Sequence, residues 1–166
     1  GQLWLTADDT ALVALRFYDA EHFCLSSDHT ACNDHAILQA ARHWLDVYFS
    51  GLKPSFMPPL RPTGTDFQQE VWRLLQEIPY GKTTTYGKIA AALAARRGIP
   101  RMSAQAVGGA VGRNPIPIFI PCHRVVGSGG KLTGYSGGLE RKQFLLSNER
   151  IDNSTLQCDS GLNTLL

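Results

Sequence analysis

The sequence predicts an α+β protein in two parts, with two strands and a helix first and a helix-rich half after them. In residues 11–17, Leu12, Ala14 and Arg16 alternate with Val13, Leu15 and Phe17, which is the two-residue period of a strand. The apolar residues of 34–50 recur at the spacing of one helical face. A proline- and glycine-rich stretch, 52–64, then separates this opening from a series of helical patterns. With 166 residues, the chain can form one compact domain or two small ones that share a core.

The first part is predicted to be a hairpin followed by a helix. Strands are expected at Leu3–Leu5 and Ala11–Phe17, joined by a short polar turn. The helix is expected over Asp34–Ser50, and Gly51 suits its C-terminal stop. Its aromatic residues are interpreted as core packing and not as a cofactor site; they are Trp44, Tyr48 and Phe49.

The second part is predicted to contain four helices. Three begin after a residue that can cap a helix N-terminus, because a side-chain oxygen can accept a hydrogen bond from the first turn. The caps are Thr65 (with Gln68 three residues on), Thr85 and Ser103. Helices Tyr86–Arg96 and Ala104–Val111, with a Gly/Pro turn between them, form a helix-turn-helix candidate, a pattern that many proteins have without binding DNA. The last helix is expected over Leu139–Arg150.

Three prolines within seven residues mark the segment Asn114–Val126. Proline removes a backbone donor and fixes φ, so a helix or a central strand is excluded there. We expect a stiff, extended and mostly apolar segment. A glycine-rich loop follows at 134–138.

Charge is distributed unevenly along the chain. Residues 1–60 carry 3 basic and 7 acidic side chains, whereas residues 61–166 carry 13 basic and 7 acidic ones. No Asp or Glu lies between Ile78 and Leu139, a stretch that holds 8 basic residues. Such a stretch favours a polyanion partner, although a solvated basic surface is the alternative. We therefore place the domain boundary at the change of sign, giving a domain at 1–60, a second at 61–150 and a tail at 151–166.

Composition excludes several classes of protein. The longest purely apolar run, Ile89–Ala95, is far too short to span a bilayer. Four cysteines without a C-x-x-C pair are too sparse for a disulfide-stapled secreted domain, so we expect a cytoplasmic or nucleoid-associated protein. The chain begins with Gly1 beside a predicted strand and without a signal-like segment, so its natural start is expected to lie upstream.

A cluster of histidines and cysteines in the first part raises the question of zinc. It comprises His22, Cys24, His29, Cys32 and His35. The spacings match no common zinc finger, and a helix is predicted to begin near Asp34. We therefore expect no metal site, and no glycine pattern indicates a nucleotide cofactor.

Cys122 and His123 are the strongest candidates for chemistry. A thiol becomes a strong nucleophile as the thiolate, which a base or a nearby cation favours, and His123 and Arg124 are both adjacent. Neighbouring residues on a strand point to opposite faces, so cooperation requires a local turn or a bridging water; Pro121 favours the turn. An inert buried cysteine beside a surface histidine is the alternative interpretation.

The string Ile120-Pro121-Cys122-His123-Arg124-Val125-Val126 resembles the signature of the O6-alkylguanine-DNA alkyltransferases. The similarity extends from about Gly64 to Glu149, through Ala106–Ala110 and Asn114-Pro115 before the signature and Gly134–Gly138 after it. It is more diffuse over the first strands. The resemblance implies an RNase H-like α/β first domain and a mainly helical second domain with a winged-helix-like helix-turn-helix.

The resemblance also implies roles for individual residues. Cys122 would accept the alkyl group and keep it, while His123, oriented by Glu149, would act as base through a water. Asn114 would be the hinge between the recognition helix and the reactive turn. Tyr86 would donate a proton to guanine N3 and crowd the 3′ phosphate of the extruded nucleotide. Tyr135 and Ser136 would line the lesion pocket.

Further residues are expected at the DNA. The partner implied is double-stranded DNA containing O6-alkylguanine, bound by a monomer through the minor groove, with the damaged base rotated out of the stack. The candidates are Gly87, Ser103, Ala104, Gln105, Arg113 and Ser128. Small residues in the second helix would permit a close approach. Gln105 stands where the family commonly has an arginine, which puts the support of the extruded base in question.

The implied activity is an irreversible, single-use transfer to Cys122, with O4-alkylthymine as a second candidate substrate. One alternative is a lesion-recognition module of the alkyltransferase-like type, which lacks the acceptor cysteine; Cys122 argues against it. A sequence-reading transcriptional regulator would need a further DNA-binding or zinc segment, which does not fit in 166 residues. A Cys–His–Glu hydrolase is the third alternative, and it would act on esters without DNA.

Overall fold

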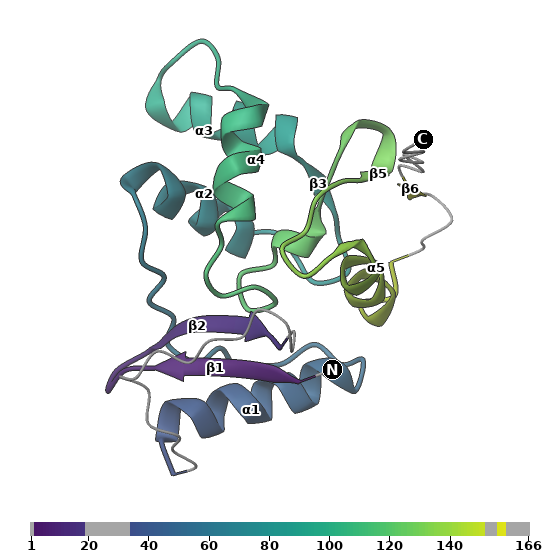
Figure 1. The fold of residues 1–166 in the computed structure, drawn as a ribbon. Helices are drawn as coiled ribbons and strands as arrows, with labels where there is room; N and C mark the ends of the chain where they lie inside the picture. The colour runs from purple at the N-terminus through teal and green to yellow at the C-terminus, as the bar shows by residue number, and fades with distance from the viewer. Residues whose placement is uncertain (1, 19–33, 152–155, 159–166) are drawn as a thin grey trace, which may run out of the picture.

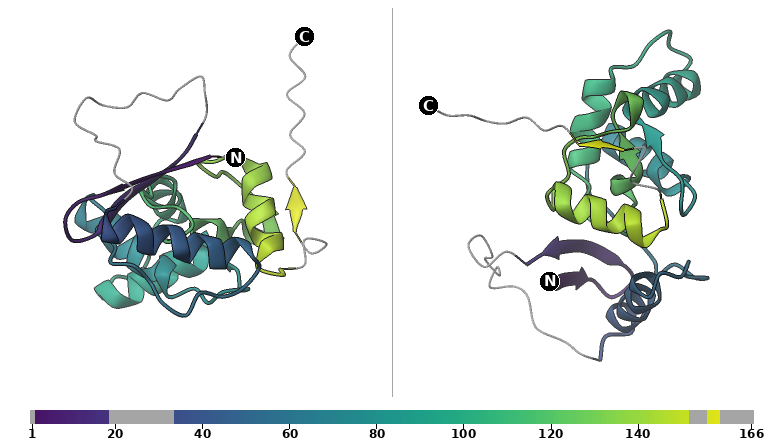
Figure 2. Two further views of the ribbon diagram at one scale, coloured as in Figure 1. Left: turned by 90° about the horizontal axis from the view of Figure 1, so that it is seen from below. Right: turned by 90° about the vertical axis from the view of Figure 1, so that its right-hand side faces the viewer.

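An antiparallel hairpin lying on one helix forms the first part of the structure (Figure 1). β1 (Leu3–Ala7) pairs with β2 (Leu12–Phe17), and α1 (Ala36–Phe49) packs against them, as both views of Figure 2 show. The predicted strand–strand–helix opening is confirmed. The computed structural model describes residues 2–18, 34–151 and 156–158.

The proline-rich stretch after α1 does more than connect the two parts. The Leu12 N–H donates to the Pro59 carbonyl at 2.8 Å, and the Arg61 N–H donates to the Leu12 carbonyl at 2.9 Å. Leu12 and Leu60 form a parallel bridge. The stretch therefore lies along the start of β2 and ties the hairpin to the second part.

Four helices dominate the second part, as the sequence predicted. They are α2 (Asp66–Gln76), α3 (Tyr86–Arg97), α4 (Ala104–Gly112) and α5 (Leu139–Asn148).

Each predicted cap is present in the structure. The hydroxyl of Thr65 accepts from the Gln68 N–H while the Gln68 side chain accepts from the Thr65 N–H, so that pair forms a capping box. Thr85 and Ser103 accept from the first turns of α3 and α4 in the same way. Gly98 ends α3 at φ 63°, a left-handed conformation that favours glycine.

Short elements join the helices. Two 3₁₀ turns, η1 (Cys122–Arg124) and η2 (Ser128–Gly130), lie on either side of a two-residue strand. That strand, β4 (Val125–Val126), pairs parallel with β3 (Thr84–Thr85) and so brings the start of α3 beside the chain that leaves η1. A second parallel pair joins two more strands, β5 (Lys131–Leu132) and β6 (Gln157–Cys158). β6 lies in the tail, where the sequence showed no pattern.

The segment after α4 is not extended as predicted. Ile118 has φ 74°, and the Ile120 N–H donates back to the Ile116 carbonyl at 2.9 Å, so the chain closes into a tight loop. Proline excluded a helix there, but it does not exclude a turn. The loop is held from Asn114, as described below.

One continuous core joins the two parts. The rings of Trp44 and Phe119 lie 4.4 Å apart between their centroids, and the Leu15 N–H donates to the Pro115 carbonyl at 2.9 Å. Trp44 and Tyr48 are buried as predicted, but Phe49 is 39% exposed, so its assignment to the core is wrong. α1 therefore brings side chains of the first part into the interior of the second. Within the described residues, no helix has the length and apolar character that crossing a bilayer requires.

Candidate active site

Cys122 and His123 lie on the single turn η1. The Arg124 N–H donates to the Pro121 carbonyl at 3.1 Å and closes this turn, as the sequence suggested for Pro121. Cys122 is 3% exposed and carries a free thiol, and His123 has no exposed surface. The alternative interpretation of a surface histidine is therefore wrong.

Asn114 holds the end of α4 to the reactive turn. Its side-chain nitrogen donates to the Ile120 carbonyl at 2.8 Å, and its side-chain oxygen accepts from the Ile116 N–H at 3.0 Å. The Cys122 N–H in turn donates to the Ile120 carbonyl at 2.8 Å. The geometry is that of a brace between the two elements, which agrees with the hinge role expected for Asn114.

Glu149, directly after α5, collects five hydrogen bonds in the interior. His123 Nε2 lies 2.7 Å from Oε1, and Arg124 donates from Nη2 to Oε1 and from Nε to Oε2 at 2.9 and 2.8 Å. The Tyr48 hydroxyl donates to Oε1 at 2.8 Å, and the Gly81 N–H donates to Oε2 at 2.9 Å. The predicted pairing of His123 with Glu149 is present in the geometry.

The protonation states follow from this network. Burial raises the pKa of Glu149, but hydrogen bonds and charge from His123 and Arg124 outweigh it and hold the pKa at about 2. Burial lowers the pKa of His123, against the pull of Glu149. A neutral His123 facing an ionised carboxylate carries its proton on Nε2, and among the described residues its Nδ1 has no hydrogen-bond partner. Nδ1 is therefore the atom that can accept a proton.

Burial raises the pKa of the Cys122 thiol to about 11, which Asn114 and the charge of Lys142 offset only in part. Lys142 is itself completely buried on α5, and its Nζ donates to the Thr133 carbonyl at 2.7 Å. Burial lowers the pKa of Lys142 to about 8. The Cys122 thiol is thus protonated near neutral pH, and the nearby charge of Lys142 favours its thiolate.

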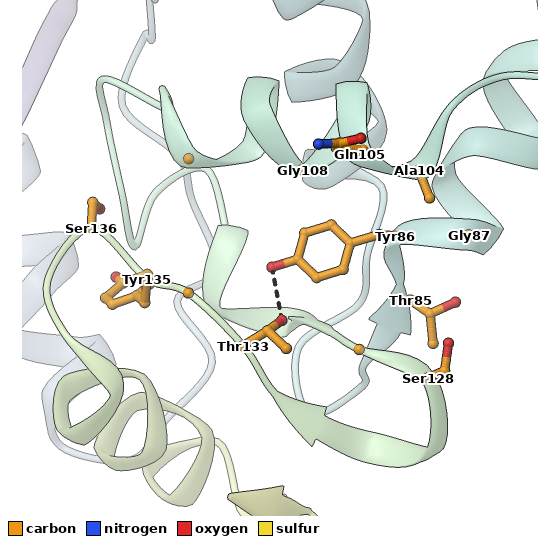
Figure 3. Close-up of a pocket in the computed structure, with 13 residues that line it drawn as sticks. Thr85, Tyr86, Gly87, Ala104, Gln105, Gly108, Ser128, Thr133, Tyr135 and Ser136 are labelled. Atoms are coloured by element: carbon orange, nitrogen blue, oxygen red, sulfur yellow. Dashed lines mark hydrogen bonds between the residues drawn. The ribbon is translucent and has the colours of Figure 1, made fainter. Parts of the chain in front are cut away.

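A pocket of about 710 Å³ lies between α4 and the loops around η2 and residues 133–136. Its lining comprises Thr85, Tyr86, Gly87, Ala104, Gln105, Gly108, Gly112, Gly127, Ser128, Thr133, Gly134, Tyr135 and Ser136. Figure 3 shows the Tyr86 ring in the middle of this pocket, with Thr85 and Ser128 on one side and Tyr135 and Ser136 on the other. Small side chains on α4 leave the space open.

Two hydroxyls in the pocket can bind a ligand. The Thr133 hydroxyl donates to the Tyr86 oxygen at 3.4 Å, which leaves the Tyr86 proton free to be donated elsewhere. The Tyr135 hydroxyl is buried and has no partner among the described residues. Burial raises the pKa of both tyrosines, so both stay protonated donors. Cys122 is close enough to both tyrosines for its charge to raise their pKa further.

Most of the residues predicted for substrate and DNA line this pocket together. They are Tyr86, Gly87, Ala104, Gln105, Ser128, Tyr135 and Ser136. Cys122, His123, Glu149 and Asn114 are buried and do not line it. Ser103 caps α4 outside the lining, and Arg113 is exposed just after α4, where it donates to the Gly109 carbonyl at 3.3 Å.

Sequence reasoning missed several residues of the site. Tyr48 was assigned to core packing alone, Arg124 only to a nearby cation, and Lys142 and Thr133 to nothing. A lysine in the apolar stripe of a predicted helix was the available signal for Lys142. Tyr48 could not have been found, because 101 positions separate it from Glu149.

The basic stretch is less free than its composition indicated. Arg96 pairs with Glu77, Arg97 with Glu70, and Arg124 with the buried Glu149. The other basic residues of the stretch are exposed: Lys82, Lys88, Arg101, Arg113 and Lys131.

For metal, His22, Cys24, His29 and Cys32 lie outside the described residues. Within the described ranges no group of three or more His, Cys, Asp or Glu side chains could hold an ion.

Comparison with known proteins assigns both parts of the chain. Residues 1–62 match the family model of the ribonuclease-like domain of 6-O-methylguanine DNA methyltransferase, and residues 66–151 match the model of its DNA-binding domain. The chain belongs to the O6-methylguanine DNA methyltransferase family. The expected family and the two-domain α+β fold are confirmed.

Individual relatives cover nearly the whole chain. The methylated-DNA–protein-cysteine methyltransferase of Methanosarcina acetivorans is 44% identical over 149 residues, which are 90% of this chain and 92% of the relative. That of Mycolicibacterium paratuberculosis is 46% identical over 150 residues, 90% of this chain and 87% of the relative. The crystal structure of Mycobacterium tuberculosis OGT in complex with DNA superposes with a TM-score of 0.72 at 40% identity, covering 93% of this chain and 88% of that one.

Membership of the O6-methylguanine DNA methyltransferase family gives the site its chemical context. The chain carries the family's DNA-binding domain, and its relatives transfer a methyl group from DNA to a protein cysteine, as their name states. Among the described residues, Cys122 is a free, buried cysteine that adjoins His123 and interacts electrostatically with the pocket residues Tyr86 and Tyr135.

Proposed function

We propose that this protein repairs O6-methylguanine in DNA by transferring the methyl group irreversibly to its own Cys122. The observation that carries the proposal is the grouping of three features: a pocket bordered by α4, a buried thiol that interacts electrostatically with the pocket residues Tyr86 and Tyr135, and the adjacent His123, whose Nδ1 has no partner among the described residues. The relatives named above support the reaction, and the geometry supports the choice of cysteine.

The proposed reaction is a nucleophilic displacement at the methyl carbon. The Cys122 proton passes through a water to His123 Nδ1, while Glu149 holds the other ring nitrogen, Nε2. The thiolate sulfur bonds to the methyl carbon, and the bond from that carbon to O6 breaks. The guanine then receives a proton, for which the Tyr86 hydroxyl at N3 is the proposed donor. The thioether is stable, so each protein molecule reacts once.

The pocket supports recognition of an extruded base. A base within the duplex hides its O6 substituent, so the nucleotide must rotate out at a cost of roughly a few kcal/mol. Tyr135 offers a buried hydroxyl that has no partner within the described part of the chain, and Ser136 lies beside it. We assign both to the contact with the damaged base.

DNA binding is proposed through the minor groove, with α4 as the inserted helix. Ala104, Gln105 and Gly108 line one wall of the pocket, and the small size of Ala104 and Gly108 permits a close approach to the groove. Gln105 would support the orphaned cytosine, and the Ser103 and Arg113 ends of α4 would meet the backbone together with Gly87 and Ser128. A monomer acting in the cytoplasm or at the nucleoid suffices for these contacts.

The experiment is the intact mass of the protein after incubation with duplex DNA containing O6-methylguanine. Wild type should gain one methyl group, about 14 Da, that saturates at one per chain and maps to Cys122. Cys122→Ser should gain none, and an undamaged duplex should modify neither protein. A wild type that binds the lesion without gaining mass would contradict the transfer and favour a recognition module. Turnover of a chromogenic ester without DNA would favour the hydrolase instead.

A further inference from the structure

We infer that Tyr48, a residue of the first domain, is a positioning residue of the proton relay in the second domain. The inference rests on the proposed function and extends it, because Tyr48 lies on α1 whereas the residues of the relay follow position 120. The observation is a direct contact between the Tyr48 hydroxyl and both His123 and Glu149.

The side chain of Tyr48 is fixed in place by burial and by packing against other aromatic rings. Tyr48 has no exposed surface, and its ring stacks on Trp44 at 5.3 Å and meets Tyr80 edge-on at 6.1 Å. Its backbone carbonyl accepts from the Asn148 side chain at 2.7 Å, one residue before Glu149. Both ends of Tyr48 are therefore tied to the end of α5.

The hydroxyl has one proton to donate and two neighbours within reach. Donation to Glu149 Oε1 at 2.8 Å is a charge-assisted bond, whereas His123 Nε2 lies at 3.3 Å. When the proton goes to Glu149, the lone pairs of the Tyr48 oxygen remain for the proton of His123 Nε2. This arrangement stabilises the tautomer with the proton on Nε2.

The tautomer decides whether the relay can work. With the proton on Nε2, the Nδ1 atom is a free acceptor and can take the proton of Cys122. If Tyr48 donated to Nε2 instead, Nδ1 would carry the proton and could not act as base. Glu149 Oε1, 2.7 Å from Nε2, favours this tautomer, and by this argument the Tyr48 hydroxyl of the first domain supports it.

Other charged groups face His123 from the packed elements, and Tyr48 acts among them. Arg124 lies on the same turn, Lys142 is on α5, and Glu149 follows it. The hydrogen bond from the Tyr48 hydroxyl also partly neutralises the negative charge on Glu149 Oε1. Its removal should strengthen the attraction of that carboxylate for the imidazolium, so the acid limb of the transfer rate should move to higher pH.

The test compares Tyr48→Phe with Tyr80→Phe. Tyr80 is the matched control, because its hydroxyl donates to the Asn148 carbonyl at 3.3 Å on the same helix end, whereas no hydrogen bond from it to His123 or Glu149 is present among the described residues. Single-turnover methyl transfer should be about tenfold slower in Tyr48→Phe, the factor that corresponds to one hydrogen bond to a charged group. Its acid limb should lie at higher pH, lesion-duplex binding should be unchanged, and Tyr80→Phe should match wild type.

A second measurement uses the wild-type protein, so it does not depend on whether the Tyr48→Phe variant folds. The ¹⁵N chemical shifts of His123 in the wild-type protein should report the tautomer with the proton on Nε2. A proton on Nδ1 would overturn the inference, as would a Tyr48→Phe protein that is slower without any shift of the acid limb, or one with the wild-type rate and profile. If wild type itself transfers no methyl group, the proposed function fails, and the His123 tautomer compared between wild type and Tyr48→Phe still tests the contact of Tyr48 with His123.

Discussion

Arg124 and Glu149 form a buried, two-point ion pair, with Nε–Oε2 at 2.8 Å and Nη2–Oε1 at 2.9 Å. Arg124 Nη1 also donates to the Ile78 carbonyl at 2.7 Å, and its guanidinium lies 5.7 Å from the centre of the Tyr80 ring. The pair links the reactive turn to the end of α5, so the carboxylate that orients His123 is held independently of His123.

Arg124→Lys should destabilise the protein by about 2–3 kcal/mol, because lysine keeps the charge but cannot donate two parallel hydrogen bonds to the carboxylate as the planar guanidinium does. Urea unfolding followed by fluorescence measures the change. Arg97→Lys is the control, since Arg97 makes a similar two-atom contact with Glu70 at the surface, and its urea midpoint should change little. Equal midpoints for the two variants would contradict the prediction.

Protonation of Glu149 at low pH should lower the free energy of unfolding. Its pKa is about 2 in the folded protein against an ordinary 4.5, so folding gains stability from the ionised carboxylate at every pH above 4.5. That contribution, about 3 kcal/mol, should disappear as the pH falls from about 4.5 to 2. Unfolding free energies measured across this range provide the check. In Glu149→Gln the same interval should lack this loss; an identical slope in both proteins would assign the acid sensitivity to other carboxylates.

The Cys122 thiol should react slowly near neutral pH and faster as the pH rises toward 11, because burial raises its pKa to about 11. Iodoacetamide labelling with peptide mapping distinguishes Cys122 from the other cysteines. Lys142→Met should slow the labelling further, since the lysine charge favours the thiolate. A labelling rate that levels off below pH 9 would mean that the thiolate is already stabilised in the resting protein.

Gln105→Arg should bind lesion-containing duplex more tightly, by roughly tenfold at low salt, and with a steeper dependence on salt concentration. Gln105 lines the pocket on α4, where a guanidinium would add charge and stacking area. Gln105→Lys separates the two effects because it supplies charge without a planar group. Titration of labelled duplex and single-turnover transfer are the measurements. Affinity and rate both equal to wild type would remove Gln105 from the site.

Phe17→Ala should weaken lesion binding by roughly 2- to 10-fold, although Phe17 does not line the pocket. Its ring meets Tyr135 at 5.9 Å and lies 5.1 Å from the Arg141 guanidinium, and a Cβ on Gly137 would lie 2.7 Å from it. The end of β2 thus supports the loop that carries Tyr135. Phe56→Ala provides the comparison, because Phe56 stacks only on His43, at 5.4 Å, among the aromatic contacts described. Equal lesion affinity in the two variants would show that the loop needs no support from β2.

The sequence by itself determined the local elements and the candidate reactive residues. Capping at Thr65, Thr85 and Ser103 depends on side chains within three residues of the atoms they bind, so spacing alone predicts it. The pair Cys122 and His123 is adjacent in the chain, and the motif around it identified the family.

Only the tertiary structure decided how these residues are held and protonated. The prolines of 114–121 excluded a helix, but the bend at Ile118 depends on Asn114 closing the loop through space. Likewise, Tyr48 reaches Glu149 across 101 positions because α1 packs into the interior of the second domain. Burial and distant hydrogen bonds set the pKa values of Cys122 and Glu149, and neither burial nor a long-range contact is encoded in local spacing.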